Sequence, residues 1–275
     1  MDATEQLAIV QLGEADAAGG ARLSSEAQWN QNEADWRFFL TKGIVFGVRD
    51  RDGRVIASAG LLPYSDGDAW ISMVLVTANW RRRGLATRLV DACIGAATRL
   101  GVTAWLDATP AGAAVYGPLG FSPTIQLRRL RFERASTVKA DVELAPGKLD
   151  DLLKLDIRAM GFDRRDLLRE LSERATSRLL SHGDAMALVR DGRTARHIGP
   201  LFAGTPTHAL AMVHDIAADE KHPLLIDAVA SQEIFLQGLT NGGWTIERPF
   251  QRMRFGRANT KAAELPFAVA GPEFG

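Results

Sequence analysis

The chain has 275 residues, of which 46% are hydrophobic and 24% charged, which is typical of a soluble globular protein with one large domain or two smaller ones. Its 33 lysines and arginines balance 33 aspartates and glutamates, so there is no overall basic field to attract nucleic acids. The single cysteine, Cys93, excludes a disulfide framework, and no apolar run approaches the roughly 20 residues that cross a bilayer.

The first half of the chain predicts strands and helices in alternation. Residues 13–25 are small, polar and rich in Gly and Ala, which predicts a loop. Asn32 and Asp35 predict the start of a helix that ends at Gly43. A hairpin turning at Asp52-Gly53 comes next. The remaining elements are a strand over 69–76, a helix over 85–100, a strand over 103–110, a short helix and turn over 111–121, and a strand over 126–133.

The second half repeats this order of elements. Asp107 in LDATP and Asp227 in LIDAV also fall at the same place in the order. We therefore predict a duplicated fold with domains over 1–135 and 136–258 and an irregular tail over 259–275, either packed or disordered; the alternative is two unrelated α/β domains. The predicted elements are a strand over 138–145, helices over 149–161 and 163–175, a hairpin over 185–202, a helix over 204–218 capped by Thr205, a strand over 222–229, a helix and turn over 231–244, and a strand over 248–256.

Three arginines, Arg81 to Arg83, stand where the helix over 85–100 begins. Positive charge at that end opposes the helix dipole. A turn from strand to helix also presents unpaired N–H groups, and Gly84 and Ala86 are small enough for a ligand to approach them. The stretch therefore predicts a phosphate site. The alternative is a solvated run of charge at a helix end.

Two motifs resemble a known family. The stretch VTANWRRRGLA, 76–86, resembles the acyl-CoA signature V-x-P-x-x-[RQ]-x-x-G-x-[GA] of the GNAT acetyltransferase superfamily, with Ala78 in the place of proline. YGPLGF, 116–121, resembles the Y-x-x-L-G-F that ends the same domain. The motif-level resemblance covers about residues 40–133. The whole chain is similar to two-domain members in which a degenerate second GNAT domain follows an active first one.

This resemblance implies an α/β fold with a tandem GNAT architecture, in which each copy has a central mixed, mostly antiparallel sheet flanked by helices. It also implies that acetyl-CoA is the co-substrate. The pyrophosphate would lie at the start of the helix, and the pantetheine arm would run along the preceding strand, which splays from the strand over 103–107. The implied cofactor-binding residues are Val74, Val76, Arg81, Arg82, Arg83, Gly84, Ala86 and Thr87.

In this family the acceptor amine attacks directly, so Cys93 is expected in the core rather than as a nucleophile. Tyr116 matches the position of the general acid that protonates the leaving thiolate; the alternative is a core tyrosine. Asp107 is the candidate base acting through water, or else a cap for the following helix. Weaker candidate bases are Glu26, Asp35 and Asp68.

The acceptor wall of the family corresponds to Trp29, Asn30 and Trp36, for which helix capping and core packing are the alternatives. Thr109 replaces a frequent asparagine, so one hydrogen bond to the cofactor differs.

The second half lacks the arginine cluster and has no tyrosine. We expect it not to catalyse, and to wall the acceptor pocket or hold the fold. Four of its charged residues could touch a substrate, but exposed helix charges are the favoured alternative: Asp163, Arg164, Arg165 and Asp227. The spacing of His197, His208 and His214 matches no metal set, and we expect no metal.

The sequence thus predicts an N-acetyltransferase that moves an acetyl group to a primary amine of a small molecule or peptide. The alternative is a silent acyl-CoA-binding sensor or scaffold. We expect no nucleic-acid or membrane partner and a monomer or homodimer. Because the N-terminus MDATEQLAIV is not a signal peptide, we expect the cytoplasm.

Overall fold

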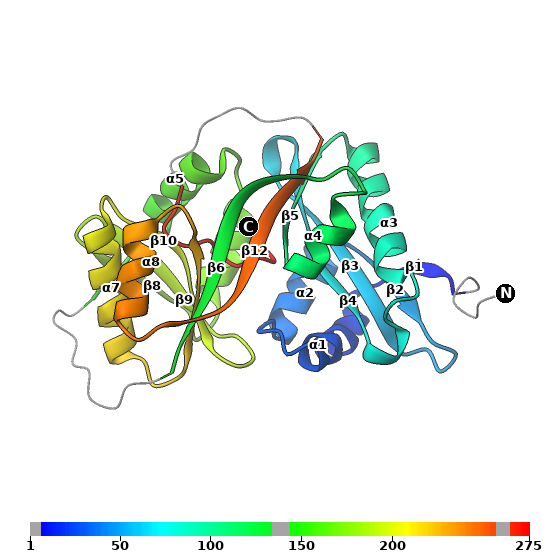
Figure 1. Cartoon of the computed structure of the whole chain (residues 1–275), viewed down its shortest axis with the longest axis horizontal. Helices are drawn as coiled ribbons and strands as arrows, with labels where there is room; N and C mark the ends of the chain where they lie inside the picture. The colour runs from blue at the N-terminus through cyan, green and yellow to red at the C-terminus, as the bar shows by residue number, and fades with distance from the viewer. Residues whose placement is uncertain (1–6, 134–143, 257–264) are drawn as a thin grey trace. The chain divides into compact units, whose positions relative to one another are not determined.

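The structure is a computed structural model that describes residues 7–133, 144–256 and 265–275, and it divides into two compact units (Figure 1). The first unit holds the described residues of 1–106, 114–122 and 254–257, and the second holds the described residues of 107–113, 123–253 and 258–275. The units therefore do not follow chain order. The predicted bounds 1–135, 136–258 and 259–275 divide the chain by sequence and not by these units, and they stay a prediction. We call these three parts of the sequence the first repeat, the second repeat and the tail.

The first repeat forms a mixed sheet with helices, as predicted. Its strands lie in the order β1-β2-β3-β4-β5, and every pair is antiparallel except β4 with β5. The elements are β1(Ile9–Gln11), α1(Ala17–Glu26), α2(Glu33–Lys42), β2(Ile44–Arg49), β3(Val55–Pro63), β4(Asp68–Val76), α3(Leu85–Leu100), β5(Thr103–Ala108), α4(Pro110–Tyr116) and β6(Ser122–Phe132).

Helix α1 lies where a loop was expected, so that prediction is wrong. The loop was predicted because this segment is rich in glycine, which disfavours helices. They are there for packing: a Cβ on Gly20 would lie 2.2 Å from the Trp36 ring of α2. Helix α2 begins and ends as predicted, with Asn32 accepting from the Asp35 N–H and Gly43 as the C-cap.

The second repeat also forms a mixed sheet, in which β10 and β11 pair in parallel and the neighbouring pairs from β7 to β10 are antiparallel. The strand β8 was not predicted, and most of the strand predicted over 138–145 lies outside the described residues. The elements are β7(Ala145–Pro146), α5(Leu149–Met160), α6(Arg165–Glu173), β8(Arg178–His182), β9(Ala185–Arg190), β10(Arg196–Phe202), α7(Pro206–Asp219), β11(Leu224–Val229), α8(Glu233–Asn241) and β12(Thr245–Phe255).

The two repeats exchange their last strands. Strand β6 comes from the first repeat, but its residues from 123 onward belong to the second unit, where β6 pairs antiparallel with β11. Strand β12 comes from the second repeat, but its last residues belong to the first unit. There Phe255 packs against Phe121, with 5.6 Å between the ring centroids. The burial patterns of β6 and β12 agree at nearly every position. This match supports the predicted duplication.

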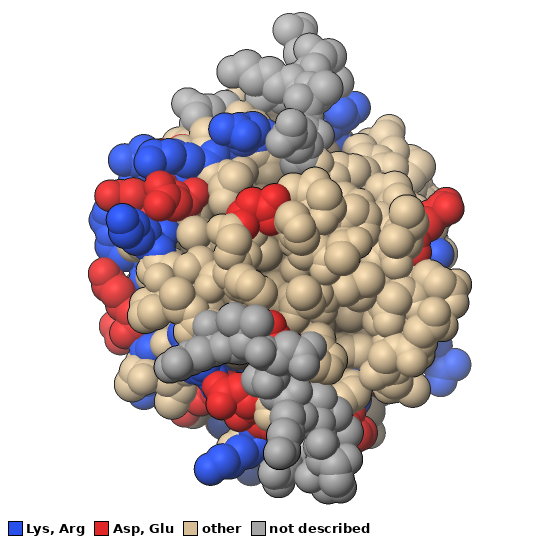
Figure 2. All heavy atoms as spheres, turned by 90° about the vertical axis from the view of Figure 1, so that its left-hand side faces the viewer, with Lys and Arg blue, Asp and Glu red and all other residues tan. Residues whose placement is uncertain are grey.

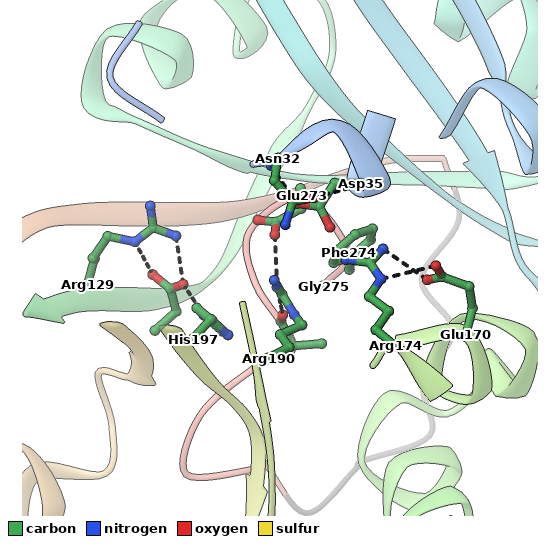
Figure 3. Close-up of polar contacts among 12 residues, drawn as sticks. Asn32, Asp35, Arg129, Glu170, Arg174, Arg190, His197, Glu273, Phe274 and Gly275 are labelled. Atoms are coloured by element: carbon green, nitrogen blue, oxygen red, sulfur yellow. Dashed lines mark hydrogen bonds and ion pairs between the residues drawn. The ribbon is translucent and has the colours of Figure 1, made fainter. Parts of the chain in front are cut away.

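A buried ion pair holds each exchanged strand in the second unit. Asp227 of β11 accepts from Arg129 of β6 at 2.9 and 2.8 Å, and the two residues are cross-strand partners (Figure 3). Asp107 of β5 accepts from Arg252 of β12 at 2.8 Å on both oxygens. Burial alone would raise the pKa of Asp227, but Arg129 and His197 lower it below its usual range.

The core of the second unit lies between its sheet and the helices α7 and α8. Figure 2 shows a broad uncharged area on the side that carries these helices, with the charged residues mainly around it. The described part of the tail, 265–275, is packed rather than disordered, because Phe267, Ala268, Val269, Ala270 and Phe274 are buried.

We expect Arg129→Met to lower the free energy of unfolding by about 3–5 kcal/mol, because it leaves the Asp227 carboxylate buried without its partner. The neighbouring Arg128→Met, which removes a partly exposed guanidinium, should change it by only about 0.5 kcal/mol. Urea unfolding followed by circular dichroism measures both. Equal losses in the two variants would contradict the role of the ion pair.

Candidate functional site

The pairing of β4 with β5 ends partway along both strands. In the described residues, the register runs from Asp68 and Thr103 to Trp70 and Trp105, although β4 continues to Val76. A one-residue bulge comes next in β4, since its register with β3 shifts after Ser72. Bulges bend a strand and interrupt its pairing. We call the place where β4 and β5 stop pairing the first splay.

Met73 marks the bulge with a φ of 53°, a left-handed conformation that is strained for a non-glycine residue. The Ser58 hydroxyl donates to the Met73 carbonyl at 2.7 Å, and Met73 is fully buried. Packing and this hydrogen bond therefore hold the bulge. Val74 and Val76, the predicted contacts for pantetheine, lie after it on β4 and are half-buried.

Two tryptophans fill the closed end of the first splay. The rings of Trp70 and Trp105 stack at 6.3 Å with an interplanar angle of 9°. Trp105 Nε1 donates to Asp68 Oδ1 at 2.6 Å. Asp68, a weaker candidate base, is therefore buried and engaged in holding β5 against β4.

Beyond β4, the chain turns into α3 and leaves a row of backbone donors. Arg82 and Gly84 have φ values of 60° and 76°, so the backbone alternates in handedness there. Gly84 is the N-cap of α3 without a side-chain cap. Within the parts of the chain that the structure describes, no hydrogen bond takes up the N–H groups of residues 82–87. Such a nest at a helix start binds anions.

Glu26, at the end of α1, fixes the beginning of this turn. Its carboxylate accepts from the Thr77 hydroxyl and from the Ala78 N–H, each at 2.5 Å. These two hydrogen bonds lower the pKa of Glu26, so it stays ionised. A proline at 78 could not donate, because it has no N–H. The departure from the family motif at Ala78 therefore has a structural reason.

The three arginines are exposed but differ in their contacts. Arg81 Nε donates to the Val76 carbonyl at 3.0 Å, which ties the turn to the end of β4. The Arg83 guanidinium lies over the Trp80 ring, 4.9 Å from its centroid. Arg82 has an exposed side chain and a left-handed backbone conformation, and it is the first residue of the row 82–87.

Tyr116 ends α4 and is buried in the first unit, 6.0 Å from Phe121 between ring centroids. Burial raises the pKa of Tyr116 to about 12, and the neighbouring Cys93 adds to the rise. The phenol therefore keeps its proton at neutral pH. Cys93 lies on the buried side of α3, where burial raises the pKa of its thiol to about 12. It is a core residue, as predicted.

The side chain of Asp107 is fully buried, and Arg252 donates to both of its oxygens. Burial raises the pKa of Asp107, and Arg252 opposes the rise. Thr109, rather than Asp107, caps α4, because its hydroxyl accepts from the Gly112 N–H at 3.2 Å. A role for Asp107 as a base stays a prediction that nothing in the structure tests.

The residues of the predicted acceptor wall differ in how deeply they are buried. Trp36 is fully buried and donates from Nε1 to the Ser24 hydroxyl at 2.9 Å, which favours core packing over substrate contact. Asn30 is buried and Trp29 half-buried at the turn between α1 and α2. Asp35, another weaker candidate base, is buried and accepts from the Asn32 N–H at 3.0 Å in a capping box.

In the second repeat the equivalent helix is α7, and its start already has a side-chain cap. Thr205 caps α7, as predicted, by accepting from the His208 N–H at 3.2 Å, and Pro206 has no N–H. The Asp184 carboxylate accepts from His208 Nδ1 at 2.7 Å when that nitrogen is protonated, and it lies close to Gly204. This helix start therefore has a cap and a carboxylate where α3 has free donors.

The prediction that all four charged residues of the second repeat are exposed helix charges is wrong. Arg164 is 3% exposed and pairs with Asp156 at 2.7 and 2.8 Å, and Asp227 is fully buried on β11. Only Asp163 and Arg165 form a surface pair, at 2.6 Å. Sequence reasoning missed these burials, and it missed Arg129 and Arg252 altogether. The repeated R-x-R-F in β6 and β12 was the available signal.

His197 lies 2.8 Å from the Asp227 carboxylate, with which it shares a buried hydrogen bond (Figure 3). Burial and the nearby Arg190 lower the pKa of His197, which leaves the ring neutral. The described residues contain no group of three or more His, Cys, Asp or Glu side chains that could hold a metal. They also contain no helix long and apolar enough to span a membrane.

Comparison with known proteins finds one family match in each half of the chain. Residues 14–121 match a family described as "Acetyltransferase (GNAT) family", and residues 152–266 match "Acetyltransferase (GNAT) domain". The chain is 27% identical over 238 residues to the uncharacterized N-acetyltransferase YitH of Bacillus subtilis (strain 168), a match that covers 82% of this chain and 83% of that protein.

Solved structures show the same fold. One from Pyrococcus horikoshii, described as a candidate acetyltransferase, has a TM-score of 0.81 at 19% identity and covers 98% of this chain and 96% of that chain. A tandem GNAT protein from the clavulanic acid biosynthesis pathway has a TM-score of 0.65 at 14% identity, with coverage of 92% and 100%. The chain therefore belongs to the GNAT acetyltransferases and carries two GNAT domains, one in each half.

Proposed function

We propose that the first unit transfers an acetyl group from acetyl-CoA to a primary amine, and that the free N–H groups of residues 82–87 bind the pyrophosphate. These uncapped donors at the start of α3 are the observation that carries the proposal. A Cβ at Gly84 would meet no atom within 4 Å, so a ligand can approach the backbone there. Arg81, Arg82 and Arg83 supply the opposite charge beside them.

The first splay supports a place for the pantetheine arm. That arm carries amide groups, which pair with main-chain groups as a neighbouring strand would. Beyond Trp70 the main chain of β4 no longer pairs with β5. Val74 and Val76 lie on this stretch, between the bulge and the arginines. This stretch continues into the uncapped start of α3, whereas the start of α7 in the second repeat has a threonine cap.

The chemistry needs one proton donor from the protein. The acceptor nitrogen attacks the acetyl carbonyl carbon, the carbon–sulfur bond breaks, and the sulfur leaves with the electron pair. Tyr116, which its raised pKa keeps protonated, donates its proton to this sulfur. The ammonium that forms on the acceptor loses its proton to water, and the Tyr116 phenolate takes a proton back from the solvent, so that the net products are the amide and the free thiol. Asp107 takes no part in this scheme, because Arg252 holds both of its oxygens.

We expect Arg82→Glu to weaken the binding of acetyl-CoA at least about 100-fold, because it removes a charge-assisted contact and adds repulsion. Arg99→Glu makes the same charge change in the last turn of α3 and should leave the affinity within about twofold. Isothermal titration measures both affinities and the stoichiometry, which we expect to be one per chain. Wild-type affinity in Arg82→Glu would refute the phosphate site.

We expect Tyr116→Phe to lower kcat roughly 100-fold while the affinity for acetyl-CoA stays unchanged, because the hydroxyl acts on the leaving sulfur and not in binding. The release of CoA in the presence of a panel of primary amines and peptides measures turnover. Tyr64→Phe is the control, since Tyr64 is the other tyrosine of the chain. Unchanged turnover in Tyr116→Phe would remove this residue from the mechanism. Binding of acetyl-CoA without turnover on any acceptor would favour a sensor.

We expect the phenol of Tyr116 to titrate at about pH 12, because burial disfavours the phenolate. The Tyr64→Phe variant leaves Tyr116 as its single tyrosine, so absorbance at the tyrosinate band reports this group alone. The raised pKa stabilises the folded state below pH 10, and this stabilisation is lost as the pH rises towards 12. A midpoint close to the ordinary value for tyrosine would contradict the buried, protonated donor.

A further inference from the structure

The second repeat has a splay of its own. Strands β10 and β11 pair in parallel only up to Ile198 and Ile226, and β10 then has a one-residue bulge before Leu201. This is the arrangement seen between β4 and β5. We call the place where β10 and β11 stop pairing the second splay.

The tail of the chain fills the second splay. On one side, Leu201 N–H donates to the Ala268 carbonyl and Phe267 N–H donates to the Leu201 carbonyl, both at 2.9 Å. On the other side, Val229 N–H donates to the Phe267 carbonyl and Val269 N–H donates to the Asp227 carbonyl, both at 3.0 Å. Ala268 thus forms antiparallel bridges with a residue of β10 and with one of β11.

The surroundings of the second splay are fitted to this segment. A Cβ at Gly199 would lie 2.0 Å from the Val269 carbonyl oxygen, so the close approach of the tail requires glycine there. Ala268 and Ala270 are fully buried. Small residues on both sides therefore let two backbones approach.

Two buried arginines hold the end of the tail. Arg190 Nη2 donates to the Ala270 carbonyl at 2.7 Å. Arg190 also pairs with Glu273 at 3.0 Å (Figure 3). Arg164 donates to the main-chain carbonyls of Phe274, at 2.9 Å, and of Gly275. Both arginines thus donate to main-chain carbonyls of the tail, and Arg190 also binds the Glu273 carboxylate, as peptide-binding sites do.

We propose that the second repeat is a peptide-binding domain, in which the second splay takes an extended peptide by main-chain pairing, and that residues 267–270 are its ligand in this chain. The tail occupies the position that corresponds to the pantetheine arm in the first splay. That comparison rests on the proposed function of the first unit, whereas the contacts of the tail do not.

The test uses the full chain and a fluorescently labelled synthetic peptide with the sequence of residues 265–275. Ala268→Glu places a carboxylate in a fully buried position and should expel the tail. Leu265→Glu introduces the same charge three residues earlier, at a position that is 37% exposed, and is the matched control. We expect the peptide to bind Ala268→Glu at least about tenfold more tightly than wild type or the control, whose tethered tails compete with it.

Hydrogen exchange gives an independent readout on the wild-type chain. The amides of Leu201 and Val229, which donate to the tail, should exchange at least about 100-fold more slowly than unstructured amides. They should exchange quickly in Ala268→Glu, and adding the peptide should restore their protection.

Equal or undetectable binding to the three folded proteins would overturn the proposal. If Ala268→Glu does not fold, the wild-type chain alone tests the proposal: fast exchange of the Leu201 and Val229 amides would overturn it. Neither measurement involves acetyl-CoA, so a failure here is distinct from a failure of the proposed function.

Discussion

The fold depends on two aspartates that are buried at the ends of central strands and are each paired with an arginine from an exchanged strand. Asp107 of β5 meets Arg252 of β12, and Asp227 of β11 meets Arg129 of β6. A buried carboxylate without its partner is strongly destabilising. Each exchanged strand must therefore be in register for the second unit to form. The ion pairs act less as a source of stability than as a condition on which strand lies where.

In both repeats a strand with a bulge stops pairing with its parallel neighbour. The two repeats differ in the segment that follows this strand. After β4 the chain enters a helix whose first N–H groups are free, and Glu26 secures the turn from outside that row of donors. After β10 the chain enters a helix with a threonine cap and a proline. Within the described residues, a common backbone geometry thus leads to uncapped helix donors in one repeat and to a capped helix start in the other.

Burial sets the protonation states around both splays. In the first unit it raises the pKa of Tyr116, so the phenol is protonated at neutral pH. In the second unit it lowers the pKa of His197, next to an aspartate that Arg129 keeps ionised. The second repeat therefore has a neutral imidazole and a paired carboxylate, and its splay carries main-chain hydrogen bonds to the tail. The two copies of one fold therefore differ in the chemistry around their splays.

The sequence by itself determined the features that depend on neighbouring residues. Asn32 with Asp35, Asp52-Gly53 and Thr205 with Pro206 predicted caps and turns correctly, since these involve residues close in the chain. The arginine motif and Tyr116 pointed to the GNAT family for the same reason. Local preference failed at α1, where Gly20 packs against Trp36 of another helix. Only the tertiary structure decided that Asp107 meets Arg252, that Arg164 is buried, and that the tail enters the second splay. These contacts join residues far apart in the chain, and no local pattern specifies which distant partner fills a buried position.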